Sequence, residues 1–361
     1  MVLKKQKKCG KMYVNSYILR NKCIMTSNIV NSDIYRENKT IYKKGKRRIN
    51  WVIFSACLCV FLVNFSALAI IYPYTLLAPY VTRYIPASTY EVLTGMLLYT
   101  LSLVIPTVIA MIACKSGFKK TLSLKPALPK NPIGFLLFAF GICLLFNIVV
   151  SVFLSWTDRF FADEVQLYTA TEDIILSFIS IAILPAVFEE ILFRGICLNC
   201  TKPMGTRFAV IFSAIIFGLA HGNPTQSLFA FLFGLFLGGV FVSTGSIVPC
   251  MLLHFFNNAL SFIANYSILD IESASVILVL LIELIFIGAM VYSIVYLVKF
   301  FKIPKRFPIF VKEEREDMLT GSGFSPLRAV FSGVWIYAFG ILYIAVIILR
   351  YAPNWLKGTV M

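Results

Sequence analysis

The stretch IILSFISIAILPAVFEEILFRGICL, at residues 174–198, decides how this chain folds. It is apolar over most of its length, yet it carries three charged residues, Glu189, Glu190 and Arg194. A helix that crosses the hydrocarbon core of a bilayer needs about 20 mostly apolar residues, so this stretch is long enough. Charged groups inside lipid are costly, and they normally face a protein interior or a wet cavity where they serve function. The stretch therefore predicts a membrane-spanning helix that takes part in chemistry.

The composition of the whole chain agrees with a membrane protein. Of its 361 residues, 59% are hydrophobic and 14% are charged, whereas soluble domains have about 45–50% and about 25%. Lipid requires every backbone polar group to be paired internally, so we predict an all-α, polytopic transmembrane helical bundle. We expect eight or nine spans, because the fifth and sixth are short. The nine candidate spans are 51–73, 91–114, 132–156, 174–198, 205–222, 226–243, 247–267, 275–299 and 329–350.

The formal net charge of +16 resembles that of a nucleic-acid-binding protein, but the placement of the charges favours a membrane protein. Fourteen of the 33 lysines and arginines lie in residues 1–50, and the loops after the second, fourth and eighth spans are also basic. The loop after the third span is acidic. This alternation follows the positive-inside rule, so we expect a multi-pass protein of the cell membrane with a cytoplasmic N-terminus. Its partner is then the lipid bilayer rather than nucleic acid, and the lysine-rich tail without targeting features favours a bacterial origin.

These features divide the chain into four segments. Polar motifs gather in the third of them, whereas the other transmembrane helices carry no recognisable signature. The segments are a basic cytoplasmic tail at 1–50, N-terminal transmembrane helices at 51–172, a transmembrane core with the polar motifs at 173–267, and C-terminal transmembrane helices with a basic cytoplasmic loop at 268–361.

The first motif is Glu189-Glu190-x-x-x-Arg194. Residues four apart share a helix face, so Glu190 and Arg194 can form an ion pair. Glu189 points about 100° away around the helix and has no such partner, which suits a general base. A surface pair at a helix end is the alternative interpretation, and it would explain Glu190 and Arg194 but not Glu189.

The other two motifs contain both histidines of the chain. In Phe217-x-x-x-His221 the phenylalanine could exclude water and hold the imidazole ring, and a core histidine without a role in chemistry is the alternative. In His254-x-x-x-Asn258 two hydrogen-bonding side chains share one helix face, and they could converge on a developing oxyanion. A polar pair that bridges two helices is the alternative for this motif.

Taken in this order, the three motifs resemble those of the CAAX-protease and bacteriocin-processing family of intramembrane endopeptidases, over residues 173–267. The resemblance implies a peptide or protein as substrate, which in eukaryotic members is best known as a prenylated CAAX protein. It also implies that Glu189 and His221 activate a water molecule. His254 and Asn258 would hold the tetrahedral oxyanion, while Glu190 and Arg194 support the geometry.

The sequence leaves two alternatives to a metal-free endopeptidase, a zinc-dependent mechanism and a non-catalytic function. The family is often described as metalloproteases, and Glu189, His221 and His254 could bind zinc. We favour the metal-free mechanism, because the chain lacks the His-Glu-x-x-His pattern of zinc proteases. A non-catalytic bacteriocin-immunity or peptide-binding membrane protein is the alternative function, although such a binder would tolerate loss of a motif. The sequence does not indicate an oligomeric state.

The predicted spans leave one conflict about depth in the membrane. Glu189 and His254 fall nearer the cytoplasmic ends of their spans, whereas His221 falls nearer the outer end of the span at 205–222. A kink near Pro203 or Gly205 would bring these groups to one level.

The predicted topology can be tested by labelling single cysteines introduced into the loops at 115–130 and 158–172. We expect thiol reagents to reach the first loop from the cytoplasmic side and the second from the opposite side, because their charges differ in sign. Labelling of both loops from the same side would contradict this topology.

Overall fold

The computed structural model describes residues 39–40, 42–64, 76–124, 134–135, 137–148, 174–265, 276–300 and 325–358. About 90% of these residues are helical, and no strand occurs among them, which confirms the all-α prediction. Most of the basic tail and the whole acidic loop at 158–172 lie outside the described residues.

Each predicted span overlaps an apolar helix, but four of these helices are long and apolar enough to cross a membrane. The predicted count of eight or nine spans is therefore not confirmed. The helix at Thr206–Ala220, for example, has 15 residues and a length of about 23 Å, against a hydrocarbon core of about 30 Å. The four long helices are Tyr42–Asn64, Ala87–Ala113 (α2), Ile174–Met204 and Gln226–Thr244; the shorter apolar helices are Leu137–Ile148, Thr206–Ala220, Val248–Ile263, Leu284–Tyr296 and Val334–Leu349.

The helix that contains the first predicted span is described continuously from Tyr42, nine residues earlier than expected, and Lys39 and Thr40 are helical as well. The basic cluster at residues 43–48 is therefore helical and lies on the first turns of this span. The helix continues to Asn64, and the remainder of the predicted span, residues 65–73, lies outside the described residues.

The long helix Ile174–Met204 is irregular along its length. It consists of α5 (Ile174–Phe178), the π-helical η1 (Ile179–Ile183), α6 (Leu184–Glu190), the π-helical η2 (Ile191–Leu198), α7 (Asn199–Thr201) and the 3₁₀ turn η3 (Lys202–Met204). Pro185 explains part of this, because its ring crowds the carbonyl of Ile181 and it has no N–H to donate to that group. We call the whole element the central helix.

The central helix turns back at Gly205, as the expected kink near Pro203 or Gly205 requires. Gly205 has φ 123°, a conformation that glycine adopts without a steric penalty. After it come α8 (Thr206–Ala220), α9 (Pro224–Thr244) and α10 (Val248–Asn265), followed by α11 (Val276–Phe300), α13 (Pro326–Phe331) and α14 (Val334–Gly358).

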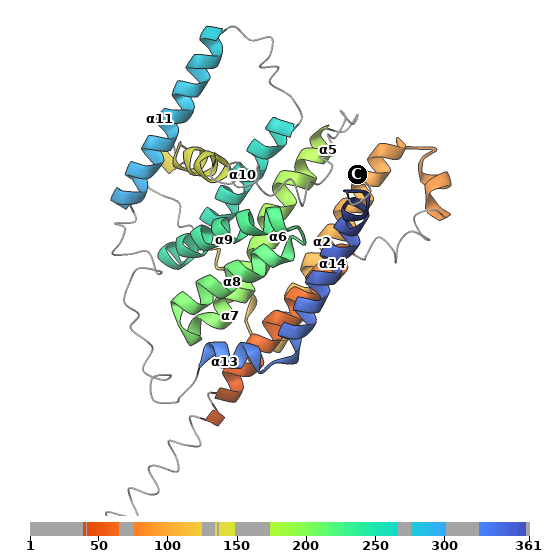
Figure 1. Ribbon diagram of the computed structural model, residues 1–361, viewed down its shortest axis with the longest axis vertical. Coiled ribbons are helices and arrows are strands. Elements are labelled where there is room, and N and C mark those ends of the chain that lie inside the picture. Colours follow the sequence, from red (N-terminus) through yellow and green to blue (C-terminus); the bar gives the residue numbers. More distant parts are fainter. Residues whose placement is uncertain are drawn as a thin grey trace, which may run out of the picture.

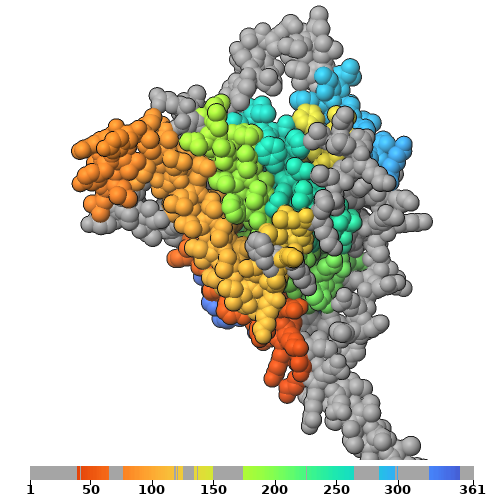
Figure 2. Space-filling view, turned by 180° about the vertical axis from the view of Figure 1, so that it is seen from behind, coloured from red at the N-terminus to blue at the C-terminus, as the bar shows by residue number. Residues whose placement is uncertain are grey.

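Two apolar cores lie on either side of the central helix and α8. One core joins these two helices to Tyr42–Asn64, α2 and α14, which run together in Figure 1, and to the short α13 at their lower end. The other joins them to Leu137–Ile148, α9 and α10. Seen from behind, α2 runs along the outer face beside the green residues of α5 (Figure 2), and it packs against α5, α6 and η2. The central helix is thus surrounded by helices from both cores.

The helices α8 and α9 pack closely because glycines lie between them. A Cβ atom at Gly218 would come within 2.6 Å of the Ser227 carbonyl oxygen, and one at Gly234 would come within 3.2 Å of the Ala214 Cα atom. Small residues allow this close approach of helix backbones in membrane bundles. The contact brings the backbone of α9 within reach of the central helix.

The turn at Gly205 also brings Glu189 and His221 to a similar level, whereas the predicted spans placed them at different depths in the membrane. Glu189 lies 13 residues before Lys202, and His221 lies 16 residues after Gly205. At about 1.5 Å per residue, these positions are roughly 20 Å and 24 Å from the same turn. Because the central helix runs on to Met204, Glu189 lies near the middle of its helix rather than near the end, level with His221.

Candidate active site

A fully buried ion pair lies at the middle of the site. The Arg194 Nη1 atom is 2.8 Å from Glu190 Oε1, and the two side chains are 1% and 0% exposed. The predicted pairing is therefore present, and the interpretation as a surface pair is excluded. Arg194 also donates through Nη2 to the carbonyl oxygen of Gly234 at 3.3 Å, and its guanidinium lies 4.5 Å from the centre of the Phe217 ring. The pair thus connects the central helix to α9 and α8.

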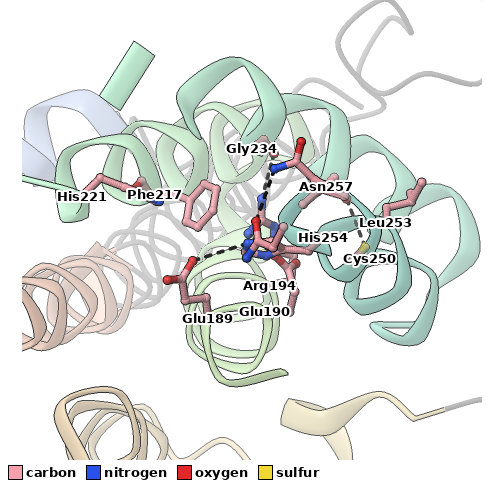
Figure 3. A network of polar contacts seen from close by, with 12 residues as sticks. Glu189, Glu190, Arg194, Phe217, His221, Gly234, Cys250, Leu253, His254 and Asn257 are labelled. Atoms are coloured by element: carbon pink, nitrogen blue, oxygen red, sulfur yellow. Dashed lines mark hydrogen bonds and ion pairs between the residues drawn. The ribbon is translucent and has the colours of Figure 1, made fainter. Parts of the chain in front are cut away.

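His254 joins this pair to the second carboxylate. Its Nδ1 atom is 2.9 Å from Glu190 Oε1, and its Nε2 atom is 3.8 Å from Glu189 Oε2. A carboxylate accepts hydrogen bonds, so Nδ1 carries the proton that is donated to Glu190. Figure 3 shows the two carboxylates, Arg194 and His254 gathered together, with the ring of Phe217 beside them. The ring centres of Phe217 and His254 are 5.8 Å apart.

Glu189 has a different environment from Glu190. Its side chain is 12% exposed, and its Oε1 atom accepts a hydrogen bond from the hydroxyl group of Tyr99. Its Oε2 atom is buried and has no hydrogen-bond partner among the described residues. No arginine or lysine pairs with this carboxylate in the described part of the chain. Glu189 is therefore the carboxylate that is left unneutralised by a fixed cation.

Glu189 and His221 line one cavity of about 200 Å³. A water molecule occupies about 30 Å³ in the liquid, so the cavity has room for several. His221 follows α8 directly, and its Nδ1 atom lies 2.8 Å from the carbonyl oxygen of Phe217. A carbonyl oxygen accepts, so Nδ1 carries the proton and leaves Nε2 with a lone pair in the neutral ring. The cavity is lined by Cys59, Val63, Tyr99, Leu103, Glu189, Phe193, Ala220 and His221.

Asn258 is held away from this cavity. Its amide group donates to the carbonyl oxygen of Ile181 at 3.2 Å, the carbonyl that Pro185 cannot satisfy. Its Oδ1 atom accepts from the amide of Asn257 at 3.3 Å, and Asn257 in turn accepts from Asn147 at 3.1 Å. The structure therefore brings His221 and Glu189 to one cavity and His254 beside Glu189, but neither His254 nor Asn258 is among the residues that line the cavity.

Three polar residues of this region were not expected from the sequence. They are Tyr99 on α2, Asn147 on the helix Leu137–Ile148, and Asn257 on α10. Tyr99 belongs to no motif, and tyrosine is common in membrane helices. Asn147 lies about 110 residues from its partner, so no local spacing marks it. Tyr99 and Asn147 each place a polar group inside a predicted span, and a polar group in lipid needs a partner. This was the one signal in the sequence that could have pointed to them.

The proposed zinc ligands do not form a metal site in this geometry. Across the described ranges, no three His, Cys, Asp or Glu side chains lie close enough together to hold a metal ion. His254 directs Nδ1 at Glu190 and Nε2 at Glu189, and Oε1 of Glu189 is bonded to Tyr99. The three side chains are therefore not assembled around a common point in the described residues, and we derive no step through a metal.

Removing one partner of the buried pair should destabilise the protein strongly. In Arg194→Met the Glu190 charge stays buried without its cation, which costs about 3–5 kcal/mol in comparable cases. We expect a much lower unfolding temperature of the purified protein in detergent micelles. The double variant Arg194→Met/Glu190→Gln should recover much of the loss, because it removes the unpaired charge and keeps an acceptor for His254.

Arg328→Met provides the matched control, since Arg328 is exposed. It should leave the unfolding temperature nearly unchanged. An Arg194→Met protein as stable as the wild type would show that the ion pair does not hold these helices together.

Comparison with known proteins places the site within a recognised family segment. Comparisons with curated proteins and with solved structures gave no significant match. The family model described as type II CAAX prenyl endopeptidase Rce1-like matches residues 171–260, about a quarter of the chain. This segment contains Glu189, His221, His254 and Asn258, and it agrees with the range expected from the motifs. Residues 171–260 are thus an Rce1-like segment of the CAAX-protease family.

Proposed function

We propose that this protein is an intramembrane endopeptidase that hydrolyses peptide bonds of a membrane-associated protein or peptide. We place it in the cell membrane with its N-terminus in the cytoplasm. The family match and the apolar helices support a membrane protease. The observation that carries the proposal is the cavity that the unneutralised carboxylate of Glu189 and the imidazole of His221 both line.

Glu189 is the general base in this proposal. Arg194 neutralises Glu190, so Glu189 keeps a carboxylate that can take a proton. Its Oε2 atom is buried, whereas Oε1 is bonded to Tyr99, which lines the cavity, so we place the water molecule at Oε1. That oxygen accepts one hydrogen bond from Tyr99, and a carboxylate oxygen has room for a second.

His221 orients the same water molecule. Its Nδ1–H is committed to the carbonyl oxygen of Phe217, so its Nε2 lone pair can accept a hydrogen bond from the water. The water then has two acceptors, of which Glu189 takes its proton and His221 holds it in place. General-base assistance of this kind contributes about 10²–10⁴ to the rate of other enzymes.

Glu189 and the water molecule account for every proton that moves during the hydrolysis. The water oxygen bonds to the carbonyl carbon of the peptide while its proton passes to Glu189. The tetrahedral intermediate then collapses, the C–N bond breaks, and the proton on Glu189 passes to the departing amine. A free carboxyl and a free amino terminus result, and Glu189 is again ionised.

We assign the oxyanion to His254 and Asn258 because of the family motifs; neither residue lines the cavity, so the peptide carbonyl would have to lie beside Glu189 on the side of α10. Glu190 accepts from His254 Nδ1 and so holds the ring with Nε2 directed toward Glu189. A ring protonated on both nitrogens can donate from Nε2 to the oxyanion. Asn258 has two amide hydrogens, and Ile181 accepts one of them, which leaves the second for the intermediate.

Glu189→Gln tests the general base. We expect the purified variant to fold but to cleave no member of a labelled peptide library that the wild type cleaves, because an amide cannot take the proton. Glu91→Gln, an exposed glutamate at the start of α2, is the matched control and should retain activity.

Retained cleavage by Glu189→Gln would remove Glu189 as the base. Loss of wild-type activity with a chelator, restored by zinc, would instead make Glu189, His221 and His254 metal ligands. A wild-type protein that binds peptides without cleaving them would support the non-catalytic alternative.

Asn258→Ala tests the oxyanion assignment. Removal of one oxyanion donor costs about 10²–10³ in kcat in other enzymes, so we expect a loss of that size with KM nearly unchanged. The bond to Ile181 gives Asn258 a second role in helix packing, so the unfolding temperature is measured in parallel. A lower unfolding temperature with unchanged kcat would assign Asn258 to packing alone.

A further inference from the structure

Tyr99 contributes to the cavity from outside the family segment. It lies on α2, and the segment that matches the family model begins at residue 171. Its ring packs against the apolar core between α2 and the central helix, and it lines the same cavity as Glu189 and His221. The cavity is therefore completed by a polar side chain that none of the three motifs contains.

The hydroxyl of Tyr99 has a defined role as a donor. It bonds to Glu189 Oε1, and an ionised carboxylate can only accept, so the phenol hydrogen points at that oxygen. The other oxygen, Oε2, is buried and faces His254 Nε2 at 3.8 Å. The carboxylate of Glu189 thus has one hydrogen bond from the described side chains, which Tyr99 donates to Oε1, while Oε2 lies near His254 without a hydrogen bond.

The other polar groups that line the cavity do not supply this bond. His221 uses its Nδ1–H on Phe217, and its Nε2 is an acceptor in the neutral ring. The thiol of Cys59 is a weak donor. Of the described side chains that line the cavity, Tyr99 is the strong donor that reaches Glu189.

We infer that Tyr99 is a positioning residue for the general base. Its hydroxyl occupies one acceptor site on Glu189 Oε1, so the remaining site on that oxygen is where the water molecule is held and deprotonated. The direction from which the water approaches the peptide carbonyl is then set by α2 together with the central helix. This inference rests on the proposed function, because it deepens the role of Glu189.

A purely structural role for Tyr99 makes a different prediction. A buried tyrosine hydroxyl usually needs a hydrogen-bond partner, and Glu189 provides one. If the bond served stability alone, Tyr99→Phe would lower the unfolding temperature and leave kcat unchanged. If the bond positions the base, the same variant lowers kcat in the fraction that is folded.

The kinetic test compares Tyr99→Phe with Tyr337→Phe. Tyr337 is exposed on α14 and donates to the carbonyl oxygen of Phe331, so the control removes the same group and one hydrogen bond far from the cavity residues. We expect Tyr99→Phe to lower kcat by about 10- to 100-fold, since a small misplacement of a reacting group can cost about 10². Its KM should stay within about twofold of the wild type, and Tyr337→Phe should change neither constant. A normal kcat in Tyr99→Phe, with Glu189→Gln inactive, overturns the inference and leaves the proposed function intact.

A second test does not depend on cleavage. Unfolding temperatures are measured for Tyr99→Phe, Glu189→Leu and the double variant in detergent micelles, because groups in direct contact show non-additive effects. We expect Tyr99→Phe to lower the unfolding temperature in the wild-type background but not in the Glu189→Leu background. Equal decreases in both backgrounds would show that the hydrogen bond is not made, and would overturn the inference. If the wild type cleaves no peptide, the proposed function fails, while this measurement still decides whether Tyr99 holds Glu189.

Discussion

The buried ion pair of Glu190 and Arg194 is the interaction on which the site depends. Two charges without solvent exposure are costly unless the remaining donors and acceptors are satisfied. Here Arg194 also donates to the backbone of α9 at Gly234, and Glu190 also accepts from His254 on α10, although Arg194 Nε and Glu190 Oε2 have no hydrogen-bond partner among the described residues. The pair therefore ties the central helix to α9 and α10, and each of these contacts depends on both charges being present.

The same pair makes two adjacent glutamates chemically different. Glu190 has the arginine four residues later as its partner, and it also accepts from His254. Glu189, one residue earlier, faces the cavity and meets a phenol and the edge of an imidazole. One carboxylate becomes part of the structural support and the other is available as a base. The side chains of Glu189 and Glu190 reach these different environments because successive residues of a helix point about 100° apart.

Local spacing accounts for what could be predicted from the sequence. The Glu190–Arg194 pair and the Phe217–His221 contact both join residues four apart, so they follow from the helix itself. The contact of His254 with the glutamates is consistent with the cost of polar groups in lipid, but no local spacing predicts it. Tyr99 and Asn147 could not be found, because tertiary packing across about 90 and 110 residues selects their partners. The number of spans also depends on where helices end, and hydropathy does not determine those ends.

The central helix is irregular on both sides of the two glutamates, and this irregularity affects how α10 packs against it. π-helical segments make up well under 1% of residues in proteins and often mark functional sites, and here they lie on both sides of the two glutamates. Pro185 disturbs the hydrogen bonding of Ile181, and the amide of Asn258 reaches across from α10 to that carbonyl. In lipid such a disturbed carbonyl needs a polar partner, because no water is present to supply one. The amide chain from Asn147 through Asn257 then fixes the orientation of Asn258, so the defect in one helix determines how α10 docks. His254 lies one turn away on α10, so its position beside Glu189 is linked through Asn258 to the carbonyl that Pro185 leaves without an N–H donor.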